Sequence, residues 1–285
     1  MDFGVVFANT GFATTPEGAT ALGTIAEELG YESLWTVEHV VVPTDYTSAY
    51  PYSPSGKMPG SADAPIPDPL IWLTYVAAQT KRIRLATGVM ILPQRNPVIL
   101  SKEVATLDVL SGGRVTFGVG IGWLREEFEA IGVPFEERAA ITDEYIEALR
   151  ALWTQDEPTF KGQHTSFENA RMYPKPVQAT VPIVIGGHSK AAARRAGRLG
   201  DGFFPARGSF DELTELFDEA RRAAKDAGRD PDAIELTAGA APDPDGIKRL
   251  AEAGVSRVVI PGFGGSAEQY KQLLGGYADN VIAKL

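Results

Sequence analysis

The chain has 285 residues, 44% of them hydrophobic, a formal net charge of −10 and no cysteine. Without cysteine, disulfides, thiolate metal sites and cysteine nucleophiles are excluded, and the composition fits a reducing cytoplasm. The acidic balance disfavours nucleic acid and anionic membranes as main partners, because both are bound through clustered cations. No apolar segment approaches the roughly 18 residues that a membrane helix needs.

A short apolar run, a polar or glycine-rich joint and an amphipathic helix recur along the chain. About eight such units predict a (β/α)8 barrel, an α/β fold of roughly 250 residues, so we expect one domain over residues 1–285. The predicted strands are residues 3–7, 33–36, 83–89, 115–119, 182–185, 202–204, 234–238 and 257–260. Chemistry in such barrels lies at the C-terminal ends of the strands, so the residues just after each run are the candidates for a site.

Two helices have clear boundaries in the sequence. Thr14 or Thr15 is positioned to cap a helix that Pro16 opens and that Gly30 stops. A longer apolar period predicts a second helix over residues 136–153. The apolar faces of these helices are interpreted as core packing.

Two insertions interrupt the repeat. Residues 37–68, after the second strand, carry six prolines and three tyrosines without helical periodicity. Loops of this length are usually lids, binding loops or disordered segments. The position at the catalytic face favours a substrate-covering loop, with a floppy surface insertion as the alternative. Residues 154–181, before the fifth strand, are expected to form an extended or hairpin-like insertion, which we interpret as mainly structural.

The fifth strand runs into Gly186, Gly187, His188 and Ser189, directly before a helix. Glycines let a ligand approach the backbone, and a helix N-terminus favours an anion. These residues therefore predict a phosphate-binding cup, and Ser189 either adds a hydroxyl donor or only caps the helix. The alternative is a plain capped turn without a ligand.

The fourth strand ends in Gly118-Val119-Gly120-Ile121-Gly122, which resembles a dinucleotide fingerprint. The resemblance fails, because the third glycine of Gly-x-Gly-x-x-Gly is replaced by Trp123. We interpret the segment as an open strand end beside a flat ligand, with Trp123 as a lid or wall. A crowded strand-to-helix corner is the alternative.

The chain has three histidines, of which two fall at predicted catalytic-face positions. His39 follows the second strand, His188 lies in the glycine joint, and His164 lies in the second insertion. No histidine or carboxylate cluster has metal-ligand spacing, so no metal is predicted. His39 is the candidate for acid–base catalysis, with a structural role as the alternative.

Several motifs complete a recognisable set when they are taken in order. They are Ala86-Thr87-Gly88-Val89, Arg95-Asn96-Pro97, residues 107–114, Gly118 to Trp123, Glu126-Glu127-Phe128, residues 182–187 and Gly200-Asp201-Gly202-Phe203. In this order and spacing the chain resembles the luciferase-like family of flavin- and deazaflavin-dependent oxidoreductases. The resemblance covers essentially the whole chain.

The resemblance implies a flat coenzyme ring at the strand C-termini. It places a bulge with a non-proline cis peptide at Gly88-Val89 behind the ring, with Thr87, Gly120 and Trp123 beside it. The coenzyme phosphate would lie against the cup of residues 186–189. His39 would touch the ring or the substrate.

The Gly-Trp-x-x-Glu-Glu-Phe segment is most similar to the deazaflavin branch of this family, which implies coenzyme F420 rather than FMN. The expected function is hydride transfer between the coenzyme and a small organic substrate. The sugar-phosphate dehydrogenases of the family carry a glutamate where this chain has Trp123, which puts glucose-6-phosphate chemistry in doubt.

Two alternatives stay open. One is an FMN-dependent monooxygenase supplied with reduced flavin by a separate reductase, and the other is a non-catalytic flavin-binding protein. Related barrels are often dimers, so a homodimer is also expected.

Overall fold

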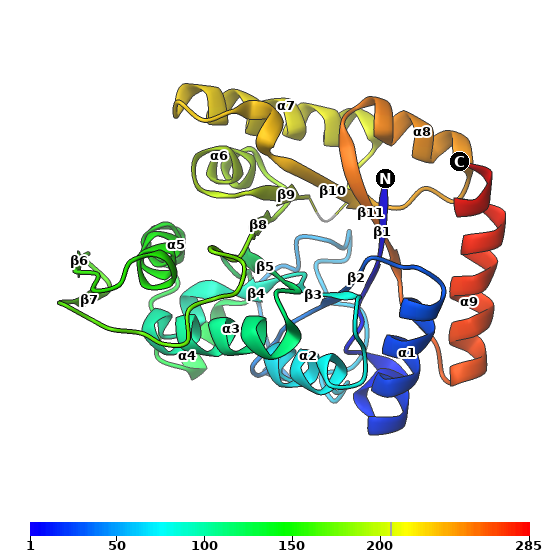
Figure 1. The fold of residues 1–285 in the computed structure, drawn as a ribbon, viewed down its shortest axis with the longest axis horizontal. Coiled ribbons are helices and arrows are strands. Elements are labelled where there is room, and N and C mark those ends of the chain that lie inside the picture. Colours follow the sequence, from blue (N-terminus) through cyan, green and yellow to red (C-terminus); the bar gives the residue numbers. More distant parts are fainter. Residues whose placement is uncertain (206) are drawn as a thin grey trace.

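Eight parallel strands close into a barrel, as the sequence predicts (Figure 1). The computed structural model describes residues 1–205 and 207–285. The barrel strands follow one another in chain order, and pairing of β3 with β5 closes the ring. They are β1 (Asp2–Val6), β2 (Ser33–Thr36), β3 (Arg84–Thr87), β5 (Val115–Gly120), β8 (Ile183–Gly186), β9 (Gly202–Phe204), β10 (Glu235–Gly239) and β11 (Val255–Pro261).

Helices surround the barrel and bury their apolar faces against it (Figure 1). They are α1 (Pro16–Glu28), α2 (Pro69–Ala77), α3 (Pro97–Ser111), α4 (Arg125–Ala130), α5 (Arg138–Thr154), α6 (Lys190–Leu199), α7 (Phe210–Asp226), α8 (Pro244–Glu252) and α9 (Ala267–Asn280). The Thr15 side chain caps α1, one of the two caps predicted. None of the helices in the described ranges has the length and apolar character needed to cross a bilayer.

Both insertions lie where the sequence places them. Residues 37–68, all of which the structure describes, run from β2 to α2 without a helix or strand. In the second insertion, β6 (Phe160–Lys161) and β7 (Ser166–Phe167) form the predicted hairpin, which lies at the periphery beside α5 (Figure 1). His164 lies in the turn of that hairpin, away from the barrel.

Most predicted strand boundaries shift by one or two residues, and two elements differ for a structural reason. The third strand, predicted over residues 83–89, is divided into β3 and β4 (Met90–Ile91). The break is the cis peptide bond between Gly88 and Val89, which the family resemblance implied. The helix expected over residues 136–153 begins and ends slightly later, at Arg138–Thr154, because residues 134–137 form a turn in front of it.

Inside the barrel, Phe204 of β9 packs against one central side chain, that of Trp35 from β2. It is fully buried, and its indole Nε1 donates to the Ser33 hydroxyl at 2.8 Å. Glycines on the neighbouring strands leave room for the ring. A Cβ atom at Gly4 would lie 3.0 Å from the indole nitrogen, and one at Gly88 would lie 3.2 Å from the ring carbon Cε3. Trp35 thus sets the depth of the barrel interior.

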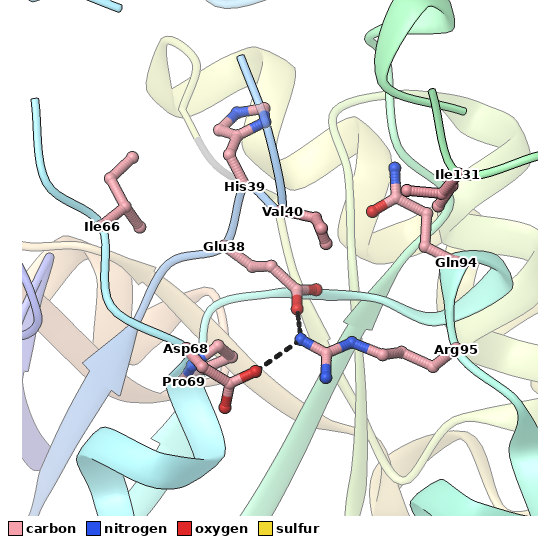
Figure 2. A pocket seen from close by; sticks show the side chains of 9 residues that line it. All are labelled: Glu38, His39, Val40, Ile66, Asp68, Pro69, Gln94, Arg95 and Ile131. Atoms are coloured by element: carbon pink, nitrogen blue, oxygen red, sulfur yellow. Dashed lines mark hydrogen bonds and ion pairs between the residues drawn. The ribbon is translucent and has the colours of Figure 1, made fainter. Parts of the chain in front are cut away.

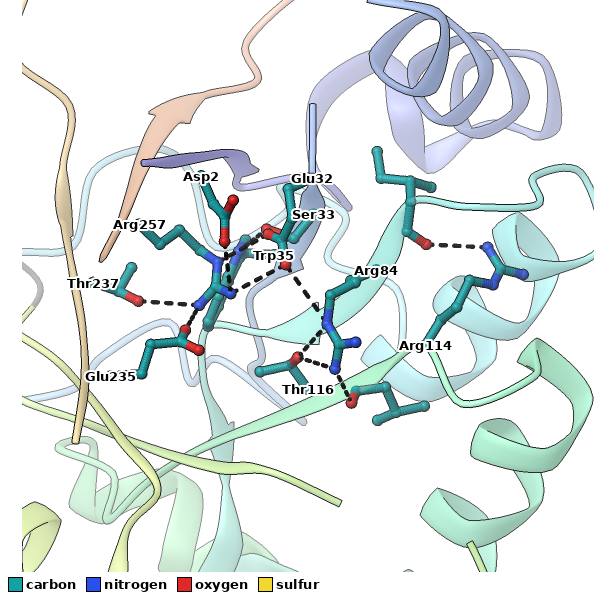
Figure 3. A network of polar contacts seen from close by, with 12 residues as sticks. Asp2, Glu32, Ser33, Trp35, Arg84, Arg114, Thr116, Glu235, Thr237 and Arg257 are labelled. Carbon is teal, nitrogen blue, oxygen red and sulfur yellow. Dashed lines mark hydrogen bonds and ion pairs between the residues drawn. The ribbon is translucent and has the colours of Figure 1, made fainter. Parts of the chain in front are cut away.

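The N-terminal end of the barrel is closed by charged side chains around Arg257 of β11 (Figure 3). Arg257 is only 4% exposed and donates to Glu32, Glu235 and Thr237. Its guanidinium lies 5.5 Å from the Trp35 ring centre. The buried charge is therefore paired, which is the condition for tolerating it in the interior.

We predict that Trp35→Ala lowers the free energy of unfolding by about 3–5 kcal/mol, because it leaves a large cavity in the barrel. The measurement is urea denaturation followed by circular dichroism. Ile71→Ala on the exposed face of α2 is the control, since surface changes stay within about 0.5 kcal/mol. Equal losses in the two variants would show that the indole does not support the barrel.

Candidate functional site

The C-terminal mouth of the barrel is lined by glycine. Side chains alternate along a strand, and those of Ala86, Val184 and Val259 pack with Trp35 inside the barrel. Residues two positions further along each strand face the same way, at the level of the barrel mouth. Four of them are Gly88, Gly120, Gly186 and Gly239. At these four positions the mouth has no side chains, whereas β9 contributes Phe204, which is paired in register with Gly186 and packs against Trp35.

Val89 occupies the centre of this mouth, directly after the cis peptide bond. A Cβ atom at Gly120 would come within 2.7 Å of Val89 Cγ2, and one at Gly186 would collide with Cγ1. Gly120 and Gly186, both predicted to bind a cofactor, thus leave space for Val89. Thr87 is buried, and its hydroxyl donates to the Gly118 carbonyl at 2.6 Å, so its side chain serves the sheet rather than the mouth.

Gly239 adds an opening that the sequence did not indicate. A Cβ atom at this position would meet nothing within 4 Å, and its backbone φ is not in the left-handed region. The side of the mouth beside β10 is therefore empty down to the backbone. No motif surrounds Gly239, which is why sequence reasoning missed it.

The predicted phosphate cup joins β8 to α6. Gly187 has φ +130°, which glycine adopts most easily, and its amide donates to the Phe204 carbonyl at 3.3 Å. Gly187 would therefore let a ligand come close to the backbone, but its N–H group is not free to donate to that ligand. The Ser189 hydroxyl accepts from the Ala192 amide at 3.1 Å, so Ser189 caps the helix while its own proton stays available.

His188 brings a further polar atom to the cup. Its Nδ1 is buried and has no hydrogen-bond partner in the described parts of the chain. The amides of Lys190 and Ala191 lie in the first turn of α6, where a helix provides no acceptor of its own. These groups can together donate to an anionic ligand.

His39 lies at the end of β2 and pairs with Glu127 of α4. Its Nδ1 is 3.1 Å from Glu127 Oε2, and the two side chains are 10% and 0% exposed. Glu127 Oε1 also accepts from the backbone amides of Val40 and Val41 at 2.6 and 3.3 Å. The sequence motif drew attention to Glu127, but its partnership with His39 was not predicted.

Trp123 lies beside His39. The two rings meet edge to face with centres 5.7 Å apart. On the loop of residues 37–68, Tyr46 and Tyr50 pack against the same indole at 5.6 and 5.0 Å. The loop is therefore held over the site by aromatic contacts.

Glu126 fastens the same loop from the neighbouring position of α4. Its carboxylate accepts from the amides and hydroxyls of Thr47 and Ser48 at 2.6–3.2 Å. Desolvation raises the pKa of Glu126, but the hydrogen bonds from Ser48 and Thr47 outweigh this effect and lower the pKa to about 2. The ionised carboxylate is thus the form that holds the loop.

A cleft of about 340 Å³ lies next to His39 (Figure 2). Its lining residues are Glu38, His39, Val40, Ile66, Asp68, Pro69, Gln94, Arg95 and Ile131. Arg95 pairs with both Glu38 and Asp68. Burial raises the pKa of Glu38, although Arg95 and the Ile91 amide favour its ionised form.

The Gln94 amide atoms in this cleft are buried without partners among the described residues. The His39 ring points away from the pair of Glu38 and Arg95 (Figure 2). The cleft and the glycine mouth thus lie at the same strand ends but have different linings. The described residues hold no group of three or more side chains arranged to bind a metal ion.

Acid should loosen the loop through Glu126. The folded-state pKa of about 2 lies below the ordinary value of 4.5, so the stabilisation is complete above pH 4.5 and is lost as the pH falls toward 2. Glu126→Gln should therefore be less stable than the parent protein at pH 7, and the gap should narrow below pH 4.5. Urea midpoints at pH 7, 4.5 and 2.5 measure it.

Glu129→Gln on the exposed side of α4 is the matched control for this pH series and should show no gap. A gap between Glu126→Gln and the parent protein that is constant across the series would contradict the anchoring role of the ionised carboxylate.

Comparison with known proteins finds relatives along the whole chain. An uncharacterized protein of Mycobacterium tuberculosis is 34% identical over 290 residues, covering 100% of this chain and 99% of its own length. An F420-dependent glucose-6-phosphate dehydrogenase of Amycolatopsis mediterranei is 34% identical over 216 residues, covering 73% of this chain and 60% of the relative.

Among solved structures, an F420-dependent secondary alcohol dehydrogenase in complex with an F420–acetone adduct superposes with a TM-score of 0.78. It is 19% identical and covers 99% of this chain and 98% of its own, which is a likeness of fold. The model of the luciferase-like monooxygenases matches residues 1–258. The chain belongs to this family of oxidoreductases.

Proposed function

We propose that the protein uses coenzyme F420 to transfer hydride to or from a small organic substrate at the C-terminal face of the barrel. The observation that carries the proposal is the glycine-lined mouth around Val89, which leaves room for a flat ring. The F420-dependent relative from Amycolatopsis supports the choice of coenzyme. The bound deazaflavin would supply the hydride chemistry, and the protein would supply binding, orientation and proton transfer.

The residues present fit such a coenzyme at both of its ends. Its ring would lie against Val89, which occupies the space at Gly120 and Gly186, and beside the open position at Gly239. Its phosphate would lie at the cup, where His188 Nδ1 is buried without a partner among the described residues. Trp123 would form the side wall.

His39 is the residue that we propose for proton transfer. It lies next to Trp123 and is held through Nδ1, so Nε2 is the nitrogen left for the substrate. The apolar side chains of Val40, Ile66 and Ile131 in the adjacent cleft suit an uncharged organic substrate. The loop of residues 37–68 would shield this substrate from water.

An FMN-dependent monooxygenase is the second candidate, favoured by the family description that matches most of the chain. It would require reduced flavin from a partner reductase. Binding of a flavin without any turnover would instead indicate a non-catalytic protein.

We predict that the protein binds coenzyme F420 at least tenfold more tightly than FMN, which corresponds to about 1.4 kcal/mol. Titration with each coenzyme at the same salt concentration, followed by tryptophan fluorescence, measures the two dissociation constants. Equal or tighter binding of FMN, with oxygen consumption in the presence of FMNH₂, would establish the monooxygenase instead.

Gly239→Leu should weaken binding of coenzyme F420 by at least tenfold without destabilising the fold. Its side chain would project into the mouth, while the backbone and its surroundings accept a Cβ atom freely. Calorimetric titration and thermal unfolding test both parts. Gly275→Leu in α9, where a Cβ atom also meets open space, is the control and should bind normally. Normal binding by a folded Gly239→Leu variant would exclude the β10 side of the mouth.

A further inference from the structure

Glu127 has an arrangement that loop anchoring alone does not explain. Its side chain is fully buried, although carboxylates are rarely buried without a specific partner. One oxygen, Oε1, accepts from two backbone amides, and the other, Oε2, faces His39 Nδ1 at 3.1 Å. Its neighbour Glu126 anchors the loop by the same kind of contacts but does not touch His39.

The hydrogen-bond pattern determines where the imidazole proton belongs. Backbone amides always donate, so Oε1 is fixed as an acceptor. When Glu127 is ionised, Oε2 has no proton to give, so the contact at Oε2 requires that Nδ1 of His39 carry one. In the neutral imidazole, Nε2 then has a free lone pair. It makes no hydrogen bond within the described residues and is not enclosed by them.

The other charged and titratable groups around His39 are engaged elsewhere. On the His39 segment, Glu38 pairs with Arg95, which also binds Asp68. On α4, Glu126 binds the loop. The loop tyrosines Tyr46 and Tyr50 face Trp123. Among the described residues, Glu127 is therefore the carboxylate in contact with the imidazole.

We propose that Glu127 is a positioning residue: it fixes the neutral His39 ring with its proton on Nδ1 and presents Nε2 to the substrate. The inference rests on the proposed function for the role of Nε2. Oxidation of a substrate carbon that bears an O–H or N–H group would release a proton from that group as well as the hydride that a bound coenzyme would take up. Nε2 would accept that proton and would return it in the reverse reaction.

The same carboxylate joins this chemistry to the loop. Val40 and Val41 lie near the start of the loop of residues 37–68. Their backbone amides both donate to Oε1 of Glu127, the residue whose Oε2 contacts His39. If the loop start moves away, Glu127 loses two of its three partners. The position of the loop start and the orientation of His39 thus depend on the same carboxylate.

Glu127→Gln tests the proposal with little change of shape. The two backbone amides require an oxygen at the Oε1 position, so the side-chain NH₂ must take the Oε2 position and donate to Nδ1. The imidazole proton is then forced onto Nε2. Glu126→Gln is the matched control, because it loosens the loop from the adjacent position without touching His39.

The first readout is the histidine tautomer, measured by long-range ¹H–¹⁵N NMR on the full chain with and without coenzyme F420 at pH 8. The three histidines make assignment simple, because His39→Ala removes one set of signals. We expect the Nδ1–H form in the parent protein and in Glu126→Gln, and the Nε2–H form in Glu127→Gln. An Nε2–H form in the parent protein would overturn the proposal, even if Glu127→Gln failed to fold.

The second readout is whether each substitution changes kcat or KM. We expect Glu127→Gln to lower kcat about 100-fold with little change in the KM of the coenzyme, whereas Glu126→Gln should act on the KM of the substrate. Equal effects on kcat in the two variants would reduce Glu127 to a loop anchor. Failure of the parent protein to turn over with F420 would refute the proposed function alone, and the tautomer would still decide the role of Glu127.

Discussion

A closed ring of eight parallel strands encloses a space that side chains must fill, and this chain fills it with Trp35. The indole takes up the middle of the barrel, so the strands on either side carry glycine where it passes. Below it, Arg257 closes the N-terminal end with paired carboxylates. Above it, Val89 and the glycines leave a shallow mouth. The depth at which a ligand can sit therefore follows from one buried side chain.

Carboxylates that accept hydrogen bonds from backbone amides are the second recurring feature of the structure. Glu27 holds the amides of residues 81–83, and Glu144 holds those of residues 163–165. Glu126 and Glu127 do the same for the loop over the site. In each case a helix or its end supplies the anion and an irregular segment supplies the donors. Segments without secondary structure thus obtain defined positions from the helices beside them.

The sequence predicted the barrel well, because each strand is a buried apolar run set between helices and this pattern is local. It also placed His39, His188 and Trp123 at the strand ends. It could not pair His39 with Glu127, which lies 88 residues away, since only the closed barrel brings β2 and α4 together. Nor could it single out Gly239, because an inward-facing glycine without a motif looks like any other. Burial and contact, rather than residue type, distinguish these positions.

The loop of residues 37–68 is held by both polar and aromatic contacts, and this limits how segments can be exchanged between related barrels. The loop and the segment from Trp123 to Glu127 are separate in sequence, yet Glu126, Glu127 and Trp123 hold the loop by polar and aromatic contacts. A loop transplanted from a relative would arrive without the surface that receives it. The loop and its receiving segment therefore form one structural unit, and transfer of the loop between relatives requires both segments to be exchanged together.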